Sequence, residues 1–116
     1  MLPTKHRLRD SADFSAVLRS RRSGRAPGPR LIVTVTPAHG SCSRVGFVVS
    51  KAVGNSVVRN RTARVLRHEM AALLPKLAGD HDIVIRATPA AGTASAESLR
   101  ADLREQLPAA VARRRR

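Results

Sequence analysis

Apolar residues recur along this chain with two different periods, which alternate from one segment to the next. Residues 30–36 and 44–51 alternate apolar with small or polar side chains, which is typical of β-strands. The residues expected on one face of each strand are Leu31, Val33 and Val35, and Val45, Phe47 and Val49. A third strand is predicted over residues 82–86, with Ile83 and Ile85 buried. Because only a short polar segment separates the first two strands, the sequence predicts that they form an antiparallel pair.

Three other segments have the spacing of amphipathic helices. The first is a short helix that Ser11 can cap, and the second spans residues 57–74 before Pro75. The apolar face of the first helix carries Phe14, Val17 and Leu18. That of the last helix carries Leu99, Leu103 and Leu107. Glycines and prolines between the first helix and the first strand predict an irregular connection there.

The resulting order of elements, α-β-β-α-β-α, predicts a small α+β sandwich with its helices packed on one face of the sheet. The opposite face then carries residues too small or polar to need burial: Thr34, Thr36, Gly46, Ser50 and Arg86. An open sheet face beside basic residues would suit an extended strand of nucleic acid.

A chain of 116 residues is expected to form a single domain, residues 1–116, with basic, flexible tails at 1–8 and 109–116. Its single cysteine, Cys42, excludes an intramolecular disulfide and a multi-cysteine zinc site. No apolar run approaches the length of a membrane span, so we expect a soluble, cytoplasmic protein without a membrane partner.

The chain has 22 basic and 8 acidic residues, which gives a formal net charge of +14. Such a charge favours a polyanionic partner, and nucleic acid is the obvious one. All but three of the basic residues are arginine, whose planar guanidinium can grip a phosphate through two hydrogen bonds.

Basic and hydrogen-bonding side chains are most concentrated in residues 51–68, which read KAVGNSVVRNRTARVLRH. On a helix, one side would carry Asn60, Arg61, Arg64, Arg67 and His68, and the other Val58, Val65, Ala72 and Leu73. Arg59 falls near the apolar flank. Gly54 and Asn55 suit a turn before the helix, Ser56 can cap it, and its first amides beside Lys51 could hold a phosphate. Because Glu69 is the only acidic residue in residues 51–70, the pattern favours an RNA-binding or DNA-binding face over a solvated helix surface.

Several interpretations remain open from the residues alone. Phe14 can stack on a base or belong to the core, whereas Phe47 is expected in the core. The four histidines, at positions 6, 39, 68 and 81, are scattered, and the acidic residues form no cluster suited to metal catalysis. Catalysis by the protein itself is therefore not expected. A structural RNA-binding protein, such as a ribosomal one, and a DNA-binding protein are the alternatives.

The string RVGFVVSKAVGNSVVRNRTARVLR resembles the signature of the bacterial ribonuclease P protein subunit. The earlier segment RLRDSADFSAVLRS is similar to the first helix of that family, and HDIVIRATPA to its last strand. Together these segments cover most of residues 5–107.

The resemblance implies a two-layer α-β sandwich of the ribosomal S5 domain 2-like kind, with a small, mainly antiparallel mixed sheet and a left-handed β-α-β crossover. It implies a partner of a catalytic RNA that removes the 5′ leader from precursor tRNA, with Mg²⁺ held chiefly by that RNA and no obligate protein partner. By similarity, the catalytic RNA would be bound by Asn55, Arg59, Asn60, Arg61, Arg64 and Arg67. The leader would lie in a cleft formed by Phe14, Val17, Leu18, Ser50, Lys51 and Arg86.

Overall fold

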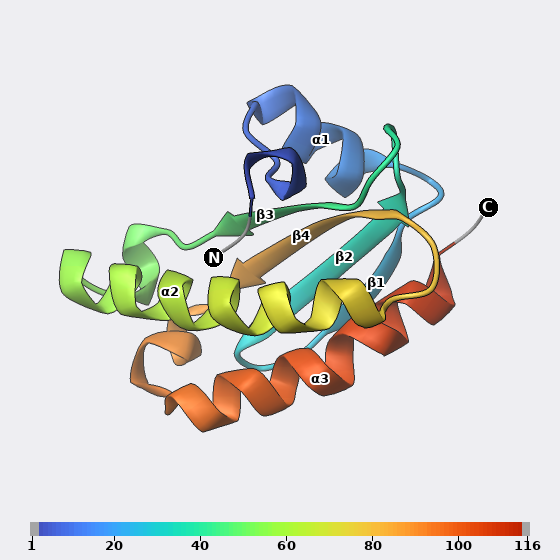
Figure 1. The fold of residues 1–116 in the computed structure, drawn as a ribbon. Helices are drawn as coiled ribbons and strands as arrows, with labels where there is room; N and C mark the ends of the chain where they lie inside the picture. The colour runs from blue at the N-terminus through green and yellow to red at the C-terminus, as the bar shows by residue number, and fades with distance from the viewer. Residues whose placement is uncertain (1–2, 115–116) are drawn as a thin grey trace.

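The computed structural model describes residues 3–114, which form three α-helices and four β-strands (Figure 1). The helices are α1 (Ser11–Arg19), α2 (Ser56–Leu73) and α3 (Ala96–Arg113). The strands are β1 (Gly24–Pro27), β2 (Leu31–Pro37), β3 (Arg44–Val48) and β4 (His81–Ala87). Four short 3₁₀ turns complete the chain: η1 (Thr4–His6), η2 (Lys51–Val53), η3 (Leu74–Lys76) and η4 (Pro89–Thr93).

The four strands form one mixed sheet in the order β1-β2-β4-β3. β2 pairs antiparallel with β1 and with β4, whereas β3 pairs parallel with β4. The predicted antiparallel pairing of β2 with β3 is therefore wrong, because β4 lies between them. β4 is buried along nearly its whole length, including Val84 between Ile83 and Ile85, and a strand apolar on both faces is most stable in the centre of a sheet.

The parallel pair β3 and β4 is connected through α2, as a parallel pair requires. In Figure 1, α2 lies in front of the sheet, both strands point to the left, and β4 lies below β3. This arrangement makes the crossover left-handed, as the family resemblance implied and against the usual preference for right-handed connections.

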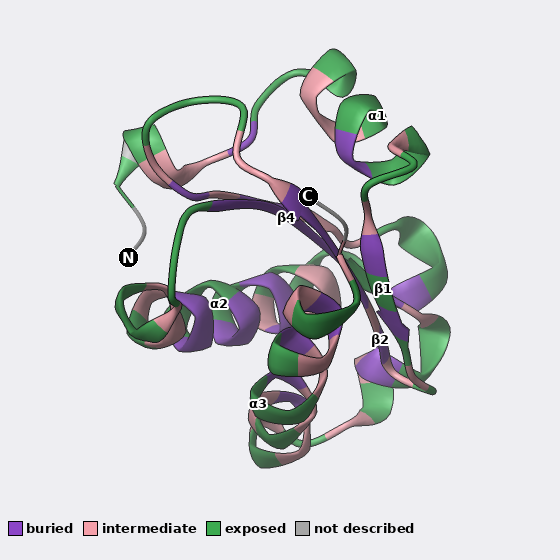
Figure 2. Ribbon diagram, turned by 90° about the vertical axis from the view of Figure 1, so that its right-hand side faces the viewer, coloured by how far each residue is buried: buried purple, intermediate pink, exposed green. Residues whose placement is uncertain are grey.

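The main core lies between the sheet and the two long helices, α2 and α3 (Figure 2). Its fully buried members include Leu31, Val33, Val35, Leu66, Met70, Ile83, Ile85, Leu99, Leu103 and Leu107. The buried faces predicted for residues 30–36, now β2, for residues 82–86, now β4, and for the last helix are thus confirmed. On α2, the prediction for Ala72 is wrong: it is exposed, because the buried side of this helix is centred on Thr62, Leu66 and Met70.

The opposite face of the sheet is covered by α1, not open as the sequence pattern predicted. A second apolar cluster there joins Leu8, Val17 and Val84, with Phe14 and Val48 packed against it. The expected open positions Thr34, Thr36 and Gly46 are consequently buried, while Ser50 and Arg86 are exposed. Small side chains on this face therefore allow α1 to approach the sheet.

Both expected tails take part in the fold where the structure describes them. Leu8 is buried and donates its amide to Val45 O at 3.0 Å, and Arg7 forms a bridge with Val45. At the other end, α3 continues to Arg113 and buries Ala110. Residues 1–2 and 115–116 of the predicted tails lie outside the described part of the chain. No helix within residues 3–114 has the length and apolar character of a membrane span.

Candidate nucleic-acid interface

The start of α2 is fixed by a glycine turn and a side-chain cap. Gly54 has a φ of 157°, a conformation that favours glycine, and a Cβ there would crowd Val58. The side-chain oxygen of Asn55 accepts a hydrogen bond from Val58 N at 3.0 Å, so Asn55 and not Ser56 is the N-cap. Ser11 is likewise the first residue of α1 and not its cap, a position that Asp10 occupies. Asn55, predicted to bind the catalytic RNA, is exposed but also holds the helix end.

The exposed side of α2 carries Asn60, Arg64, Arg67 and His68, as the helical spacing predicted. Arg61 is partly buried on the flank of this face, where its guanidinium nitrogens lie 3.4 Å from Ala94 O. Arg59 lies on another side of the helix, where its Nη2 donates a hydrogen bond to Ser56 Oγ at 3.3 Å. We call Asn60, Arg61, Arg64 and Arg67 the α2 basic face; the structure places Arg59 outside it.

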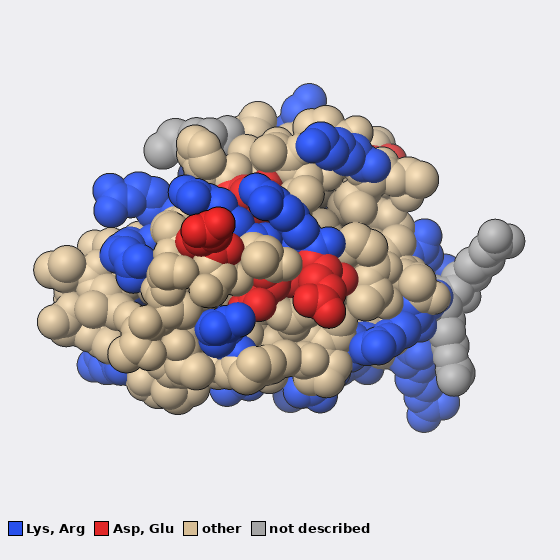
Figure 3. All heavy atoms as spheres, turned by 90° about the horizontal axis from the view of Figure 1, so that it is seen from below, with Lys and Arg blue, Asp and Glu red and all other residues tan. Residues whose placement is uncertain are grey.

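The α2 basic face keeps its positive charge uncompensated. The four ion pairs within residues 3–114 link Arg30 to Asp102, Arg44 to Asp13 and Asp82, and Arg104 to Glu69. None of them includes a residue of the α2 basic face. Seen from below α2 and α3, acidic side chains gather in the middle of the surface and basic side chains surround them (Figure 3). Paired arginines thus serve the fold, and those of α2 remain available to an anionic partner.

A groove runs between α1 and the sheet on the face opposite α3. Its central hollow, about 570 Å³, is lined by residues of α1 and by the chain from β3 into η2: Arg9, Ser11, Phe14, Ser15, Leu18, Phe47, Val48, Val49 and Ser50. Phe14 and Phe47 also line a hollow of about 350 Å³ that reaches Arg7 and Arg67. Leu18 lines a third, of about 320 Å³, together with Thr34, Arg25 and Arg86. Because neighbouring hollows share lining residues, we call the three together the sheet groove.

Most of the residues predicted for a leader cleft lie along the sheet groove. Phe14, Leu18, Ser50 and Arg86 line it, and Lys51 is exposed directly after Ser50. Leu18 is 50% exposed, so its apolar side chain is available at the groove surface. Val17 is the exception: it is 1% exposed and attaches α1 to the sheet, so it does not line the groove.

Two groove residues differ from the sequence interpretation. Phe14 is half-buried, with its ring over Gly46, where a Cβ would clash with it, so it is at once a packing residue and a groove wall. Phe47, expected in the core, is also only partly buried and lines two hollows. Alternation along β3 could not show this, because it does not reveal that β3 is an edge strand of the sheet.

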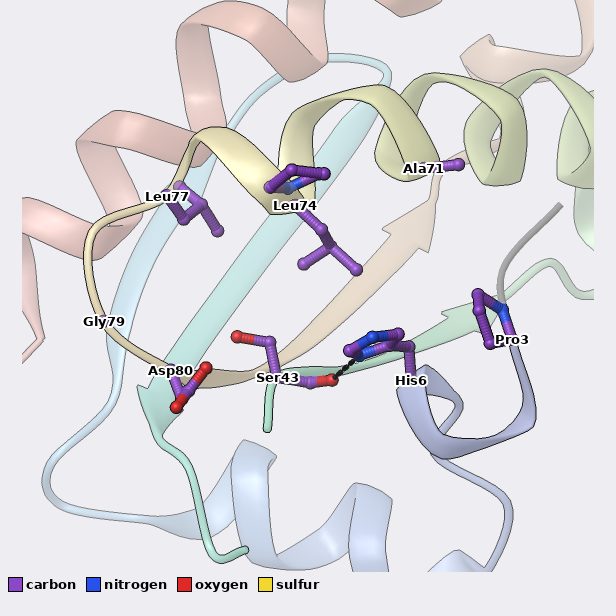
Figure 4. A pocket seen from close by; sticks show the side chains of 9 residues that line it. Pro3, His6, Ser43, Ala71, Leu74, Leu77, Gly79 and Asp80 are labelled. Carbon is purple, nitrogen blue, oxygen red and sulfur yellow. Dashed lines mark hydrogen bonds between the residues drawn. The ribbon is translucent and has the colours of Figure 1, made fainter. Parts of the chain in front are cut away.

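A separate cavity of about 470 Å³ lies at the C-terminal end of α2 (Figure 4). His6 lines it, with Nδ1 2.6 Å from Ser43 O, opposite Leu74, Leu77 and Asp80. None of the described residues that line this cavity is a lysine or an arginine, so its chemistry does not match a phosphate backbone. Among residues 3–114, no group of three or more His, Cys, Asp and Glu side chains is placed to hold a metal ion.

The chain is similar to known proteins along most of its length. A family model described as Ribonuclease P matches residues 2–111. The ribonuclease P protein component of Kocuria rhizophila is 46% identical over 114 residues, which cover 97% of this chain and 98% of the relative. The chain belongs to the ribonuclease P protein family. The corresponding component of Pseudarthrobacter chlorophenolicus is 49% identical over 104 residues, covering 88% and 74% of the two chains.

Solved structures of ribonuclease P proteins have the same fold. That from Staphylococcus aureus superposes with a TM-score of 0.80 at 22% identity, covering 89% of this chain and 93% of the other. That from Thermotoga maritima gives a TM-score of 0.71 at 21% identity, covering 84% and 90%. As a ribonuclease P protein, the chain is the protein subunit of an endoribonuclease that processes tRNA, and its partner is an RNA subunit. Family membership therefore decides against the ribosomal and DNA-binding alternatives.

Proposed function

We propose that this ribonuclease P subunit binds two RNAs through two surfaces: the α2 basic face docks the catalytic RNA, and the sheet groove holds the 5′ leader of precursor tRNA. The observation that carries the proposal is the position of the unpaired charge. Arg64 and Arg67 are exposed on α2, outside the described ion pairs, whereas the groove lies between the sheet and α1. Arg67 reaches the groove at one end, so the two RNAs would meet there.

The sheet groove suits a single strand more than a duplex. Its walls combine the aromatic ring of Phe14 and the side chain of Leu18, both on α1, with exposed arginines at both ends. Unpaired bases can stack on the Phe14 ring while guanidinium groups contact the backbone, a combination typical of single-strand binding sites. Such contacts tolerate different sequences, which would broaden the range of precursors that the holoenzyme cleaves.

The described residues do not fit a Mg²⁺ site of their own. Mg²⁺ prefers oxygen ligands, chiefly carboxylates. Asp13, Glu69, Asp82 and Asp102 are held by arginines, and among residues 3–114 no three His, Cys, Asp or Glu side chains come together to hold a metal ion. We therefore propose that the Mg²⁺ required for cleavage is held by the RNA, and that the endonucleolytic step takes place there. Since precursor tRNA is made in the bacterial cytoplasm, we place the protein in that compartment.

Docking through the α2 basic face is tested with Arg64→Ala in the reconstituted holoenzyme. Loss of one phosphate contact is expected to weaken binding of the catalytic RNA about fivefold at physiological salt and to lower the salt slope by about 1. Arg64 is exposed, so the melting temperature should not change. Lys76→Ala, which removes one exposed charge at the far end of α2, is the matched control. Equal affinities of the two variants, or cleavage by the protein without RNA, would contradict the proposal.

Leader binding is tested with Phe14→Leu and Phe14→Ala. Both remove the stacking ring, so each should lower the affinity for leader-bearing precursor about tenfold, while binding of mature tRNA is unchanged. Leucine retains most of the packing over Gly46, whereas alanine should also destabilise the fold by about 1 to 2 kcal/mol. Thermal unfolding of both variants separates the two effects. Full leader preference in Phe14→Leu would show that Phe14 serves packing alone.

A further inference from the structure

A second group of arginines gathers where the connection from α1 to β1 meets the end of α3. We call this surface the basic end; it consists of Arg21, Arg22, Arg25, Arg113 and Arg114. Arg113 donates from Nη1 to Arg25 O at 2.9 Å, and Gly24 lies directly against the backbone of Ala110 and Arg114. Figure 1 shows the last turn of α3 beside β1 and the preceding connection. The fold thus joins two arginine-rich segments that are almost ninety positions apart in sequence.

The charge of the basic end is not balanced by nearby acidic residues in its own segments. The sequence contains no aspartate or glutamate from residue 14 to 68, and none after Glu105. Arg21, Arg22, Arg25 and Arg113 are exposed, and none takes part in the ion pairs of residues 3–114. Guanidinium groups gathered on one surface repel one another unless an anionic partner lies among them.

The basic end continues the sheet groove. Arg25 lines the same hollow as Leu18, Thr34 and Arg86. The register of the sheet explains this: Arg25 is opposite Thr34 and Arg86 is opposite Ile32, so both arginines lie on the face of the sheet that α1 covers. A strand that leaves the groove past Arg86 therefore arrives at Arg25, on the edge strand β1.

The direction of the leader follows from the position of the catalytic RNA. The end of the groove next to Arg67 adjoins the α2 basic face, where the cleaving RNA would dock. Nucleotides nearest the cleavage site must lie at that end. The opposite end, at Arg25, must then receive nucleotides further upstream.

We propose that the basic end binds the backbone phosphates of leader nucleotides upstream of those held in the sheet groove. This inference rests on the proposed leader-binding function and extends it, because it predicts that affinity increases with leader length. Arg22 and Arg25 are the best placed to make the contacts, since their side chains are exposed and border the hollows beneath α1. The contacts would be electrostatic and insensitive to base identity.

The test measures holoenzyme affinity for precursors with leaders of about 4 and about 12 nucleotides, and for mature tRNA. Arg22→Ala/Arg25→Ala should weaken binding of the long leader about tenfold at physiological salt and lower its salt slope by about 1.4, at about 0.7 for each single-strand contact. Binding of the short leader and of mature tRNA should not change. Lys76→Ala/Arg100→Ala removes the same charge from other surfaces and is the control. Equal melting temperatures of the two double variants confirm that the fold is intact.

The outcomes separate this inference from the proposal on which it depends. If the wild type binds short-leader precursor no better than mature tRNA, leader binding itself is refuted. If the short leader adds affinity but Arg22→Ala/Arg25→Ala leaves the gain from the long leader intact, only the role of the basic end is refuted. An equal loss for all three substrates would assign the basic end to the tRNA body or the catalytic RNA and would also overturn the inference.

Discussion

Replacing Arg44 by methionine is expected to lower the free energy of unfolding by about 3 to 5 kcal/mol. Arg44 in β3 donates to the Asp82 carboxylate of β4 through Nε at 3.2 Å and Nη2 at 3.0 Å, and its Nη1 lies 3.5 Å from Asp13 of α1. Asp82 is only 2% exposed. Methionine would fill much of the volume but leave the Asp82 carboxylate buried with only the amide of His39, at 3.3 Å, as a described donor. An uncompensated buried charge is the reason for the size of the effect.

The double variant Arg44→Met/Asp82→Leu distinguishes this cause from a loss of packing. With both charges removed, most of the stability should return, since apolar replacements of buried ion pairs are often neutral or better. Asp13→Asn should cost less than about 1 kcal/mol, because that carboxylate is 32% exposed. Hydrogen bonding to Asp82 raises the pKa of Arg44 above its ordinary value, so the pair stays charged up to high pH. Urea unfolding measures all three variants, and a double variant as unstable as Arg44→Met would contradict the electrostatic explanation.

The parts of the fold that the sequence predicted are those in which burial is periodic. Leu99, Leu103 and Leu107 share one side of a long helix, and Ile83 and Ile85 share one side of a central strand, so each pattern reports directly on the core. The α2 basic face was predictable for the same reason. Along α2, buried residues and arginines each recur at helical spacing, on different sides of the helix.

Long-range pairing was not predictable, because it depends on segments far apart in the chain. β1 is four residues long, carries Gly24 and Pro27 at its ends, and is defined by backbone pairing with β2 alone. These residues indicate a turn when considered locally. The position of β4 between β2 and β3 likewise depends on the crossover through α2, which no pattern within the strands reveals.

The same limit applies to the candidate site. Arg30 and Arg44 pair with acidic residues 72 and 38 positions away, so composition could not show which arginines are free. Helical spacing placed Phe14, Val17 and Leu18 together on one side of α1, but only the sheet beneath decides that Val17 is buried while Leu18 borders two hollows. Spacing thus identifies the surface, and tertiary packing assigns the roles within it.

Gly24→Ala is expected to destabilise the protein by about 3 kcal/mol, a large effect for a single methyl group. The backbone of Gly24 is not in the left-handed region, so alanine can adopt its conformation and the effect is steric. A Cβ at this position would overlap Ala110 O and Arg114 N, which are backbone atoms in the last turn of α3. Neither atom can rotate away as a side chain could, so β1 and α3 would have to separate.

Gly40→Ala is the matched control for Gly24→Ala, since a Cβ at Gly40 would meet no atom within 4 Å and should leave the melting temperature unchanged. Separation of β1 from α3 would also break the hydrogen bond from Arg113 to Arg25 O and divide the basic end. Gly24→Ala holoenzyme should therefore lose affinity for long leaders at temperatures where the protein is still folded, while the short leader, which we propose lies at Phe14 and Leu18, should still add affinity over mature tRNA. A variant with normal stability would show that α3 does not press on β1 at this point. A destabilised variant with an unchanged gain from the long leader would show that the leader does not need Arg113 and Arg25 to be held together.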